Sequence, residues 1–376
     1  MLPALLRRVP FPENRADILL AVGLGISFFI FGYVGNLLSP IQGSVGLLWP
    51  PTGLALGVLL LFSSNLWPGI LLGGFFVNLL IWGRPPLVSL AVVTGATVGV
   101  LCGYVLLRRV GFRIQLDRMR DLIALVALGA VAGMTITSTV RVGTLTLAGL
   151  VPADRFWTAW WLDELSSIMG VIIVTPVVLL ASRIRRLRPP RPRRVVEAAA
   201  VLGAAFVVMS IATHARSELL FLIFPVLIWA ALRFQVKLAA PCVLLVSLLT
   251  VYGAAVGSGP FEGQGLSSKV DTVLAFELAT ALTSLVLAVT TVERIRAHGE
   301  VERTADELAS VVAQLSRSLG RRLVPPVIEE ATDRISGERR VVRERIRTPR
   351  DSRVDPDTSD LAHPLHGDTP VTPEDD

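Results

Sequence analysis

The most constraining feature of this chain is a series of apolar runs, each long enough to cross a lipid bilayer. Between Ile18 and Val292 the charged residues cluster in a few short segments, and the runs between them are nearly free of charge. A membrane helix needs about 20 predominantly apolar residues. Only 18% of the chain is charged, against about 25% in a soluble domain. The sequence therefore predicts an all-α polytopic membrane protein.

The apolar runs predict a bundle of 8–10 transmembrane helices. The second, third and eighth runs are short or contain proline, so eight spans with re-entrant or broken helices compete with ten. The ten candidate spans are Ile18–Leu38, Gly46–Phe62, Leu66–Trp82, Leu87–Leu107, Leu122–Val140, Phe156–Ala181, Val195–Thr213, Leu219–Leu232, Leu238–Val256 and Thr272–Val292.

The distribution of arginine predicts the orientation of these spans. The segments 108–120 and 183–194 are arginine-rich, whereas the segments 38–45 and 257–271 carry almost no positive charge. Arginine and lysine are enriched in cytoplasmic loops. The pattern predicts an even number of spans, with both termini on the cytoplasmic side of a bacterial inner membrane. It also accounts for the formal net charge of +6 without a nucleic-acid partner.

Small residues recur at four-residue spacing within several runs. This spacing places them on one helix face and lets two helix backbones approach closely, which predicts tight helix packing. The series are Gly53 and Gly57, Gly69 and Gly73, Gly95, Gly99 and Gly103, and Gly129 and Gly133.

A different pattern follows the last run. Apolar residues alternate spacings of four and three from Val301 to Leu319, which is typical of a coiled-coil seam, and Gly320 then ends the predicted helix. We expect the last span to continue into the cytoplasm and to form a homodimer through 301–319; the alternative is an amphipathic helix packed on its own protein. The predicted division is an N-terminal segment 1–16, a membrane domain 17–296, a heptad helix 297–320 and a charged, largely disordered tail 321–376.

No sequence motif of an enzyme is present. The chain lacks a P-loop, a His-Glu-x-x-His motif, a Cys-x-x-Cys motif and a Gly-x-Ser-x-Gly motif, and its two cysteines lie inside apolar runs. We therefore expect no catalytic residue, no metal and no cofactor, and a lipid bilayer as the immediate surroundings.

Four charged residues lie inside predicted spans, where charge is costly and usually faces a bundle interior or a cavity. By the predicted topology all four fall in the extracytoplasmic half. They are either a structural ion-pair group between helices or the lining of a ligand or ion pocket open to the outside. These residues are Arg141, Asp163, Glu164 and Glu277.

Three segments together resemble the bacterial membrane-associated sensor family of type one, the MASE group, over roughly residues 17–296. The first is the Trp-Pro-Pro-Thr-Gly motif with the Trp-Pro-Gly motif and an asparagine after it. The second is a Trp-Trp helix that ends in Val-Thr-Pro. The third is Phe-Pro-Val-Leu-Ile-Trp-Ala-Ala-Leu-Arg-Phe, followed by Gly-Pro-Phe. The motif residues are Trp49, Pro50, Pro51, Thr52, Gly53, Trp67, Pro68, Gly69, Asn78, Pro176, Pro225, Trp229, Arg233, Gly259, Pro260 and Phe261.

The resemblance implies an integral membrane sensory module that is normally joined to a cytoplasmic histidine kinase, diguanylate cyclase or protein phosphatase. Two departures from the family pattern occur. Ser166 and Ser167 stand where the family often has Gly-Asp, with the acid at Asp163 one turn earlier. No recognisable output domain follows the heptads, so we expect a kinase, cyclase or phosphatase partner or a lost output domain.

The prolines of the first motif predict a broken helical hairpin. Pro50 and Pro51 remove backbone donors, and Thr52 can return a hydrogen bond to the freed carbonyl groups. Broken membrane helices often surround ligand sites, and a fixed packing kink is the alternative. Pro176 and Pro225 predict further kinks.

The leading functional hypothesis is a sensory module that relays an unknown cue through the tenth span. A small-solute transporter is the alternative from another class, since broken helices and buried carboxylates suit it. A membrane scaffold, whose arginine-rich loop 183–194 meets anionic lipid or a partner kinase, is a third possibility.

Overall fold

The computed structural model describes residues 14–37, 47–184, 192–215, 219–263 and 265–318, and in these ranges the regular structure is entirely helical. The N-terminal segment 1–13 and the predicted disordered tail 321–376 lie outside the described residues. In chain order the elements are α2 (Arg15–Leu37), α3 (Pro50–Leu61), η1 (Ser64–Leu66), α4 (Trp67–Phe76), η2 (Val77–Ile81), α5 (Pro86–Arg109), α6 (Met119–Ala124), η3 (Leu125–Ala132), α7 (Gly133–Leu147), η4 (Ala153–Arg155), α8 (Phe156–Ile184), α9 (Pro192–His214), η5 (Leu220–Leu222), α10 (Ile223–Phe234), α11 (Val236–Val256), η6 (Gly259–Phe261) and α12 (Leu266–Ser318).

Each of the ten predicted spans corresponds to a helical segment. Within the described ranges, eight helices are long and apolar enough to cross a membrane, and the two shorter apolar segments are Pro50–Leu61 and Leu220–Phe234. The 12-residue α3 is about 18 Å long at 1.5 Å per residue, which is less than the roughly 30 Å hydrocarbon core of a bilayer. The all-α polytopic fold is confirmed, and the protein is a multi-pass membrane protein.

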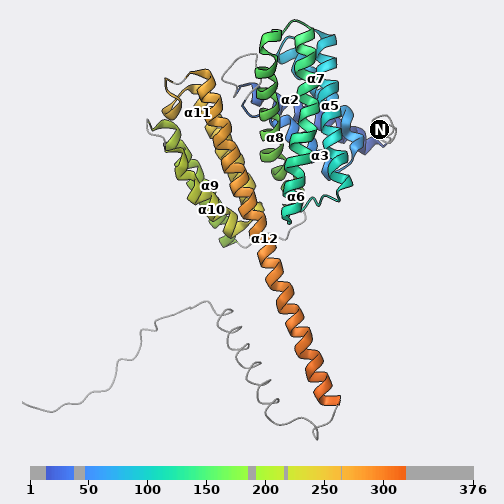
Figure 1. Ribbon diagram of the computed structural model, residues 1–376, viewed down its shortest axis with the longest axis vertical. Coiled ribbons are helices and arrows are strands. Elements are labelled where there is room, and N and C mark those ends of the chain that lie inside the picture. The colour runs from blue at the N-terminus through green and yellow to red at the C-terminus, as the bar shows by residue number, and fades with distance from the viewer. Residues whose placement is uncertain (1–13, 38–46, 185–191, 216–218, 264, 319–376) are drawn as a thin grey trace, which may run out of the picture. The chain divides into compact units, whose positions relative to one another are not determined.

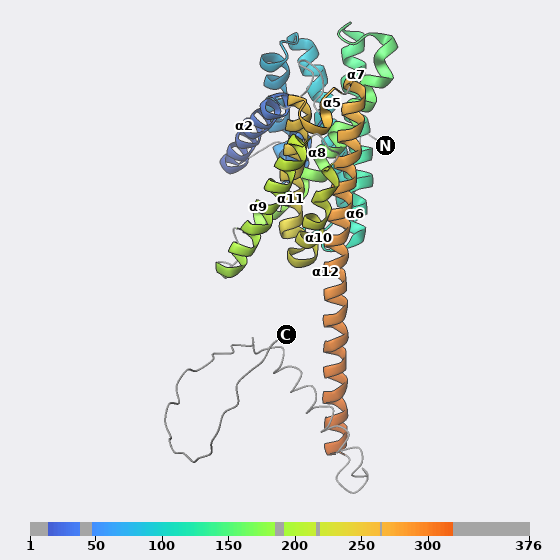
Figure 2. The same ribbon diagram turned by 90° about the vertical axis from the view of Figure 1, so that its left-hand side faces the viewer.

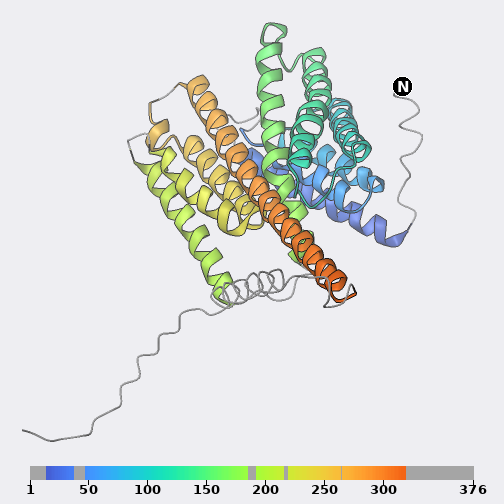
Figure 3. The same cartoon turned by 60° about the horizontal axis from the view of Figure 1, so that its bottom comes forward.

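The helices of the membrane bundle form two groups that meet at α8. Figure 1 shows α2, α3, α5, α7 and α8 on one side and α9, α10, α11 and the upper part of α12 on the other. Figure 2 gives the view at right angles, and Figure 3 shows α8, in green, between the teal helices and the yellow to orange ones. In the hydrophobic window of α8, 72% is buried, against 17% for α9. Helix α8 is therefore the core of the bundle, and α9 is a peripheral helix with most of its apolar surface open to lipid.

The predicted glycine seams are confirmed as close helix contacts. Helices α5 and α7 pack along their small residues, and a Cβ atom on Gly99 would lie 2.7 Å from the carbonyl oxygen of Gly133. A Cβ atom on Gly73 of α4 would lie 2.5 Å from the carbonyl oxygen of Gly25 in α2. Larger side chains would push these backbones apart, so the glycine spacing fixes which helices approach most closely.

Most prolines of the motifs lie in the first turn of a helix and do not interrupt it. Pro50 and Pro51 occupy the first turn of α3, Pro68 the first turn of α4, and Pro225 the first turn of α10. Proline is tolerated there because the first N–H groups of a helix have no intrahelical partner. The predicted broken hairpin is thus two separate helices: α3 packs mainly on α8, and α4 packs mainly on α2. Pro176 does lie inside a helix, α8.

Helix α12 continues without a break from Leu266 to Ser318. The residues up to Glu300 and those from Val301 form separate units. Within the second unit the heptad positions Val301, Leu308 and Val312 are exposed. The last residues of the predicted seam, including Leu319 and the terminating Gly320, lie outside the described side chains.

Candidate functional site

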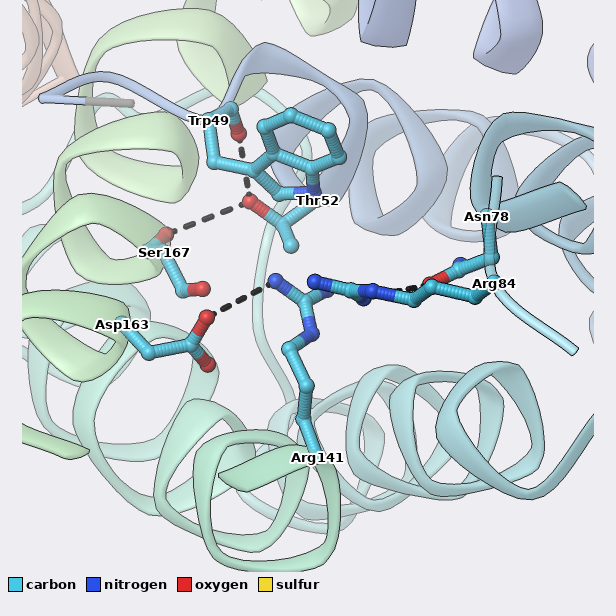
Figure 4. A network of polar contacts seen from close by, with 7 residues as sticks. All are labelled: Trp49, Thr52, Asn78, Arg84, Arg141, Asp163 and Ser167. Atoms are coloured by element: carbon cyan, nitrogen blue, oxygen red, sulfur yellow. Dashed lines mark hydrogen bonds and ion pairs between the residues drawn. The ribbon is translucent and has the colours of Figure 1, made fainter. Parts of the chain in front are cut away.

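The Trp-Pro-Pro-Thr-Gly segment docks its backbone onto the middle of α8. Trp49 precedes α3, is only 1% exposed, and donates its backbone N–H to the carbonyl oxygen of Ser166 at 3.2 Å. The hydroxyl group of Thr52 lies 2.8 Å from the carbonyl oxygen of Trp49 and 3.2 Å from that of Ser167 (Figure 4). Non-helical backbone at membrane depth is tolerated only where protein satisfies its polar groups, and these contacts do so.

Glycines on both helices make this docking possible. A Cβ atom on Gly170 of α8 would lie 2.0 Å from the carbonyl oxygen of Trp49, and one on Gly53 of α3 would lie 2.0 Å from the carbonyl oxygen of Gly170. One turn further along α8, Thr175 donates its hydroxyl to the carbonyl oxygen of Gly53 at 3.0 Å. The motif therefore holds the start of α3 against α8 through main-chain atoms.

Docking places the indole of Trp49 in a stack with a second tryptophan and two arginines. The rings of Trp49 and Trp82 are 5.2 Å apart with an interplanar angle of 26°. The guanidinium carbon of Arg84 lies 4.2 Å from the Trp82 ring centroid, and that of Arg141 lies 5.6 Å from the Trp49 ring. Each arginine is thus held by an indole face, where the ring quadrupole attracts a cation.

A widened helical turn brings Trp82 and Arg84 to this position. The segment η2 is a π-helix, and Trp82 donates its backbone N–H to the carbonyl oxygen of Val77. The indole N–H of Trp82 donates to Asn36 Oδ1 of α2 at 3.0 Å, and Arg84 donates to Asn78 Oδ1 at 2.7 Å. Wide turns of this kind occur often at functional sites.

Arg141 of α7 and Asp163 of α8 form a buried ion pair. Arg141 Nη1 lies 2.9 Å from Asp163 Oδ1, and the side chains are 4% and 0% exposed. A buried charge is tolerated only when a partner of opposite charge compensates the loss of water. The pair therefore fixes α7 against α8 at the level of the tryptophan stack.

Arg84 adds a second positive charge beside this pair. Burial, together with the charge of nearby Arg141, lowers the pKa of the Arg84 guanidinium to about 10. That pKa is still far above neutral, so Arg84 is charged under physiological conditions. Within the described part of the chain, no carboxylate lies at ion-pair distance from Arg84. One close carboxylate, Asp163, therefore interacts with the positive charge of two guanidinium groups.

A comparison with known protein families matches residues 18–294 to MASE1, a membrane-associated sensor domain family. The chain belongs to the MASE1 family. This confirms the family that the three motifs indicate and establishes a membrane sensor domain, which is not a catalytic domain. No curated protein and no solved structure gives a significant match to the chain.

The other two charged residues predicted for the membrane interior of the MASE1 domain lie in different surroundings. Glu164 accepts a hydrogen bond from Thr135 of α7 at 3.1 Å, so it faces a different part of α7 from Asp163. Glu277 of α12 is fully buried and accepts a hydrogen bond from Ser247 of α11. The structure therefore joins Arg141 with Asp163, and Glu277 belongs to the contact between α11 and α12.

The remaining motif residues of the MASE1 domain build packing contacts. Phe261 is fully buried, and a Cβ atom on Gly259 would lie 2.4 Å from the carbonyl oxygen of Thr213, so the Gly-Pro-Phe turn closes tightly on the end of α9. Arg233 of α10 forms an exposed ion pair with Glu197 of α9 at 3.1 Å. Trp229 is 63% exposed, as expected for a side chain that faces lipid. Trp67, Pro68 and Gly69 start α4, where Gly69 meets the backbone of Ala21.

The structure contains a further contact, between the segment before α6 and residues 293–296 of α12, of which the sequence gives little indication. Arg296 forms an ion pair with Asp117, and Glu293 accepts a hydrogen bond of 2.7 Å from the backbone N–H of Met119, the first residue of α6. We call Asp117, Met119, Glu293 and Arg296 the loop–α12 contact. Its charged residues resemble ordinary topological charges in the sequence, so only the fold reveals their pairing.

No group of three or more histidine, cysteine, aspartate or glutamate side chains in the described ranges is arranged to hold a metal ion. The polar chemistry of the MASE1 domain is instead carried by the arginine–tryptophan stack near the start of α3 and by the loop–α12 contact.

Proposed function

We propose that this MASE1 domain converts a stimulus received in the membrane bundle into a displacement of α12, and that α12 passes it to a cytoplasmic partner. The partner would be a kinase, cyclase or phosphatase. In this proposal both termini face the cytoplasm of a bacterial inner membrane, and the chain has no catalytic activity of its own. The loop–α12 contact is the observation that carries the proposal.

The loop–α12 contact ties α12 to the first helical group by charge. The carboxylate of Glu293 caps the N-terminus of α6, where unbonded N–H groups and the helix dipole favour a negative charge. Asp117 is 4% exposed, and its partner Arg296 is about half exposed. A displacement of α7 relative to α8 would be passed along the α6–η3–α7 segment to Met119 and from there to α12.

A cavity beside this contact gives α12 space to move. Its volume is about 180 Å³, and it lies between the segment before α6 and helices α8, α11 and α12. Its lining includes Asp117, Pro176, Lys237 and Arg296. Close-packed interfaces resist small shifts, so a cavity beside α12 at Val292 and Arg296 lowers the cost of a change in helix position.

We further propose that the signal leaves through a homodimer of the heptad segment 301–319. The exposed apolar residues Val301, Leu308 and Val312 repeat with the spacing of a coiled-coil seam. A second copy would bury them, and a shift of α12 in each copy would change the alignment of the two helices. A ligand can drive this only if it binds the two arrangements with different affinity.

Disulfide crosslinking of the full chain in native membranes tests the relay. A reporter cysteine replaces Leu308 in a background with Cys102→Ala and Cys242→Ala. We expect Asp117→Asn and Glu293→Gln, which break the loop–α12 contact, to change the rate of crosslinking at position 308 by at least about threefold, or about 0.65 kcal/mol.

The matched control is Glu197→Gln, which removes an exposed ion pair to Arg233 outside α12 and should leave the rate unchanged. Equal rates in all variants would contradict the relay. A chain that stays monomeric by light scattering and never crosslinks at position 308 would contradict the dimer.

The alternative of a solute transporter has less support. It would need a polar route from the Arg141–Asp163 pair to the cavity at Arg296. Along α8 between these levels the buried side chains include Met169, Val171, Ile172, Ile173 and Val174. Uptake of a labelled solute by membrane vesicles, lost in Asp163→Asn or Glu277→Gln, would favour transport over sensing.

A further inference from the structure

The arrangement of charges around Trp49 is incomplete without a negative partner. Figure 4 shows the guanidinium groups of Arg84 and Arg141 pointing toward the same region, Arg84 from the right and Arg141 from below, and Asp163 is bonded only to Arg141. Arg84 is bonded to the neutral amide of Asn78. Two guanidinium groups this close repel each other in a medium of low dielectric constant, and one carboxylate offsets only one of them.

We propose that Arg84 and Arg141 form a binding site for a small oxyanion, a carboxylate or phosphate group, and that this ligand is the class of cue that the MASE1 domain detects. Guanidinium groups match both oxyanions through paired, charge-assisted hydrogen bonds. The assignment of the ligand as a cue rests on the proposed sensory function, whereas binding itself can be measured without it.

Unbonded buried donors point to the same ligand class. Within the described ranges, Arg141 Nε and the indole Nε1 of Trp49 are buried and have no hydrogen-bond partner. Arg141 is 3% exposed and Trp49 is 1% exposed. Buried donors in proteins are almost always bonded, and these two belong to the same stack as Arg84. An oxyanion would supply the acceptor oxygens that they lack.

The bonding of the nearby carboxylates Asp163 and Glu164 is compatible with a bound anion. Asp163 has one further unbonded oxygen, Oδ2, so a ligand that carries a hydroxyl or ammonium group beside its oxyanion would also satisfy the acid. Glu164 is the next titratable group on α8, and its bonded oxygen is held by Thr135 of α7. The site therefore combines excess donors from Arg84, Arg141 and Trp49 with one carboxylate, Asp163, at ion-pair distance from Arg141.

The position of Arg84 explains how binding would act on the bundle. Arg84 lies between the spans Ser64–Ile81 and Pro86–Arg109 and is half-buried. Arg141 belongs to α7, which is tied to α8 by its ion pair. An anion held by both arginines would draw the Arg84 loop toward α7. It would therefore stabilise an arrangement in which this loop and α7 lie close together over one in which they lie further apart.

Isothermal titration calorimetry of the full chain in maltoside micelles tests the site. The probes are sodium phosphate and sodium succinate, in chloride buffer at constant ionic strength. We expect both anions to bind the unmodified chain and Arg84→Gln to weaken binding by at least about tenfold, the effect of losing one charge-assisted hydrogen-bond pair. Arg84→Lys should recover part of the affinity.

The matched control is Arg108→Gln, because Arg108 also lies over an aromatic ring, that of Tyr104, at 5.5 Å, but at the other end of α5. This variant should bind both anions as the unmodified chain does. A second arm uses nanodiscs of phosphatidylglycerol or phosphatidylcholine: binding only in phosphatidylglycerol, lost in Arg84→Gln, identifies a lipid headgroup as the source of the oxyanion.

The proposal is overturned if none of phosphate, succinate or phosphatidylglycerol binds, or if Arg84→Gln binds them unchanged. The crosslinking assay at position 308 is independent of this result. A chain that binds no anion but responds to Asp117→Asn retains the relay and loses the anion site. A chain that binds anions through Arg84 but shows no response to Asp117→Asn retains the site and loses the relay.

Discussion

Asp163 is the residue on which the charge balance of the bundle depends most. It bonds Arg141 directly at 2.9 Å, and its charge also acts favourably on Arg84. Removal of Arg141 leaves Asp163 with Arg84 nearby, so part of its compensation remains. Removal of Asp163 leaves the buried guanidinium group of Arg141 and the half-buried one of Arg84 with no close carboxylate. Removal of Asp163 should therefore lower the stability of the protein more than removal of Arg141.

We predict that Asp163→Asn destabilises the protein by about 3–5 kcal/mol, the range for breaking a buried pair, and that Arg141→Gln costs less. Thermal unfolding in maltoside micelles, followed with a thiol-reactive dye at the buried Cys242, measures the order. Asp154→Asn, an exposed acid just before α8, is the control and should change little. Equal losses for Asp163→Asn and Arg141→Gln would contradict a shared role of Asp163.

At this scale the sequence predicts part of the site. Arg141 and Asp163 stand out because charge inside an apolar run is rare, and the structure pairs them. Depth along a helix does not specify the direction that a side chain faces, so Glu277 could not be separated from them beforehand. Arg84 does not stand out in the sequence, because a loop arginine usually only sets topology. Its one signal is its place in a loop on the side predicted to be poor in positive charge.

Among the helices, the contact between α3 and α8 is the one that leaves least room for change. Gly170 approaches the backbone of Trp49 so closely that any side chain would meet the Trp49 carbonyl oxygen and the Thr52 hydroxyl at 2.0 and 2.6 Å. Main-chain atoms cannot rotate away as a flexible side chain can. An added methyl group must therefore separate the two helices and disturb the tryptophan stack.

We predict that Gly170→Ala lowers stability by at least about 3 kcal/mol, at or beyond the upper end of ordinary overpacking. The matched control is Gly203→Ala in α9, where a Cβ atom meets nothing within 4 Å; the higher helix propensity of alanine should make it neutral or slightly stabilising. The same thermal unfolding measurement compares them. A Gly170→Ala protein as stable as Gly203→Ala would show that the helices can separate without loss.

Helix positions and glycine seams could be predicted, but the partners of each seam could not. Apolar length identified all ten helical segments, and four-residue spacing identified the faces that pack closely. The spacing is identical in α3, α4 and α5, so nothing in it distinguishes α8, α2 and α7 as their respective partners. The role of Pro50 and Pro51 also depends on context, because the same pair can break a helix or begin one.

The orientation of the whole protein depends on whether the short helix α3 carries the chain across the membrane. If it did not, α4 would run in the opposite direction, and Arg108 and Arg109 at the end of α5 would lie on the outer side. The arginine-rich segment after α8 would also be placed outside. Both results conflict with the enrichment of arginine on the cytoplasmic side. We therefore expect α3, together with the residues before it, to complete a crossing.

Single-cysteine labelling of intact cells tests this topology in the background without Cys102 and Cys242. With both termini inside, cysteines that replace the exposed Leu37 and Leu147 should react with a membrane-impermeant maleimide in intact cells. Cysteines that replace Phe62 and Ala297 should react only after permeabilisation. Labelling at position 62 shows whether α3 crosses the membrane, because Phe62 follows α3 directly and is 54% exposed. Labelling of position 62 in intact cells, with position 147 also labelled, would show that α3 returns to the side from which it entered, so that the crossings before α7 would have to be reassigned.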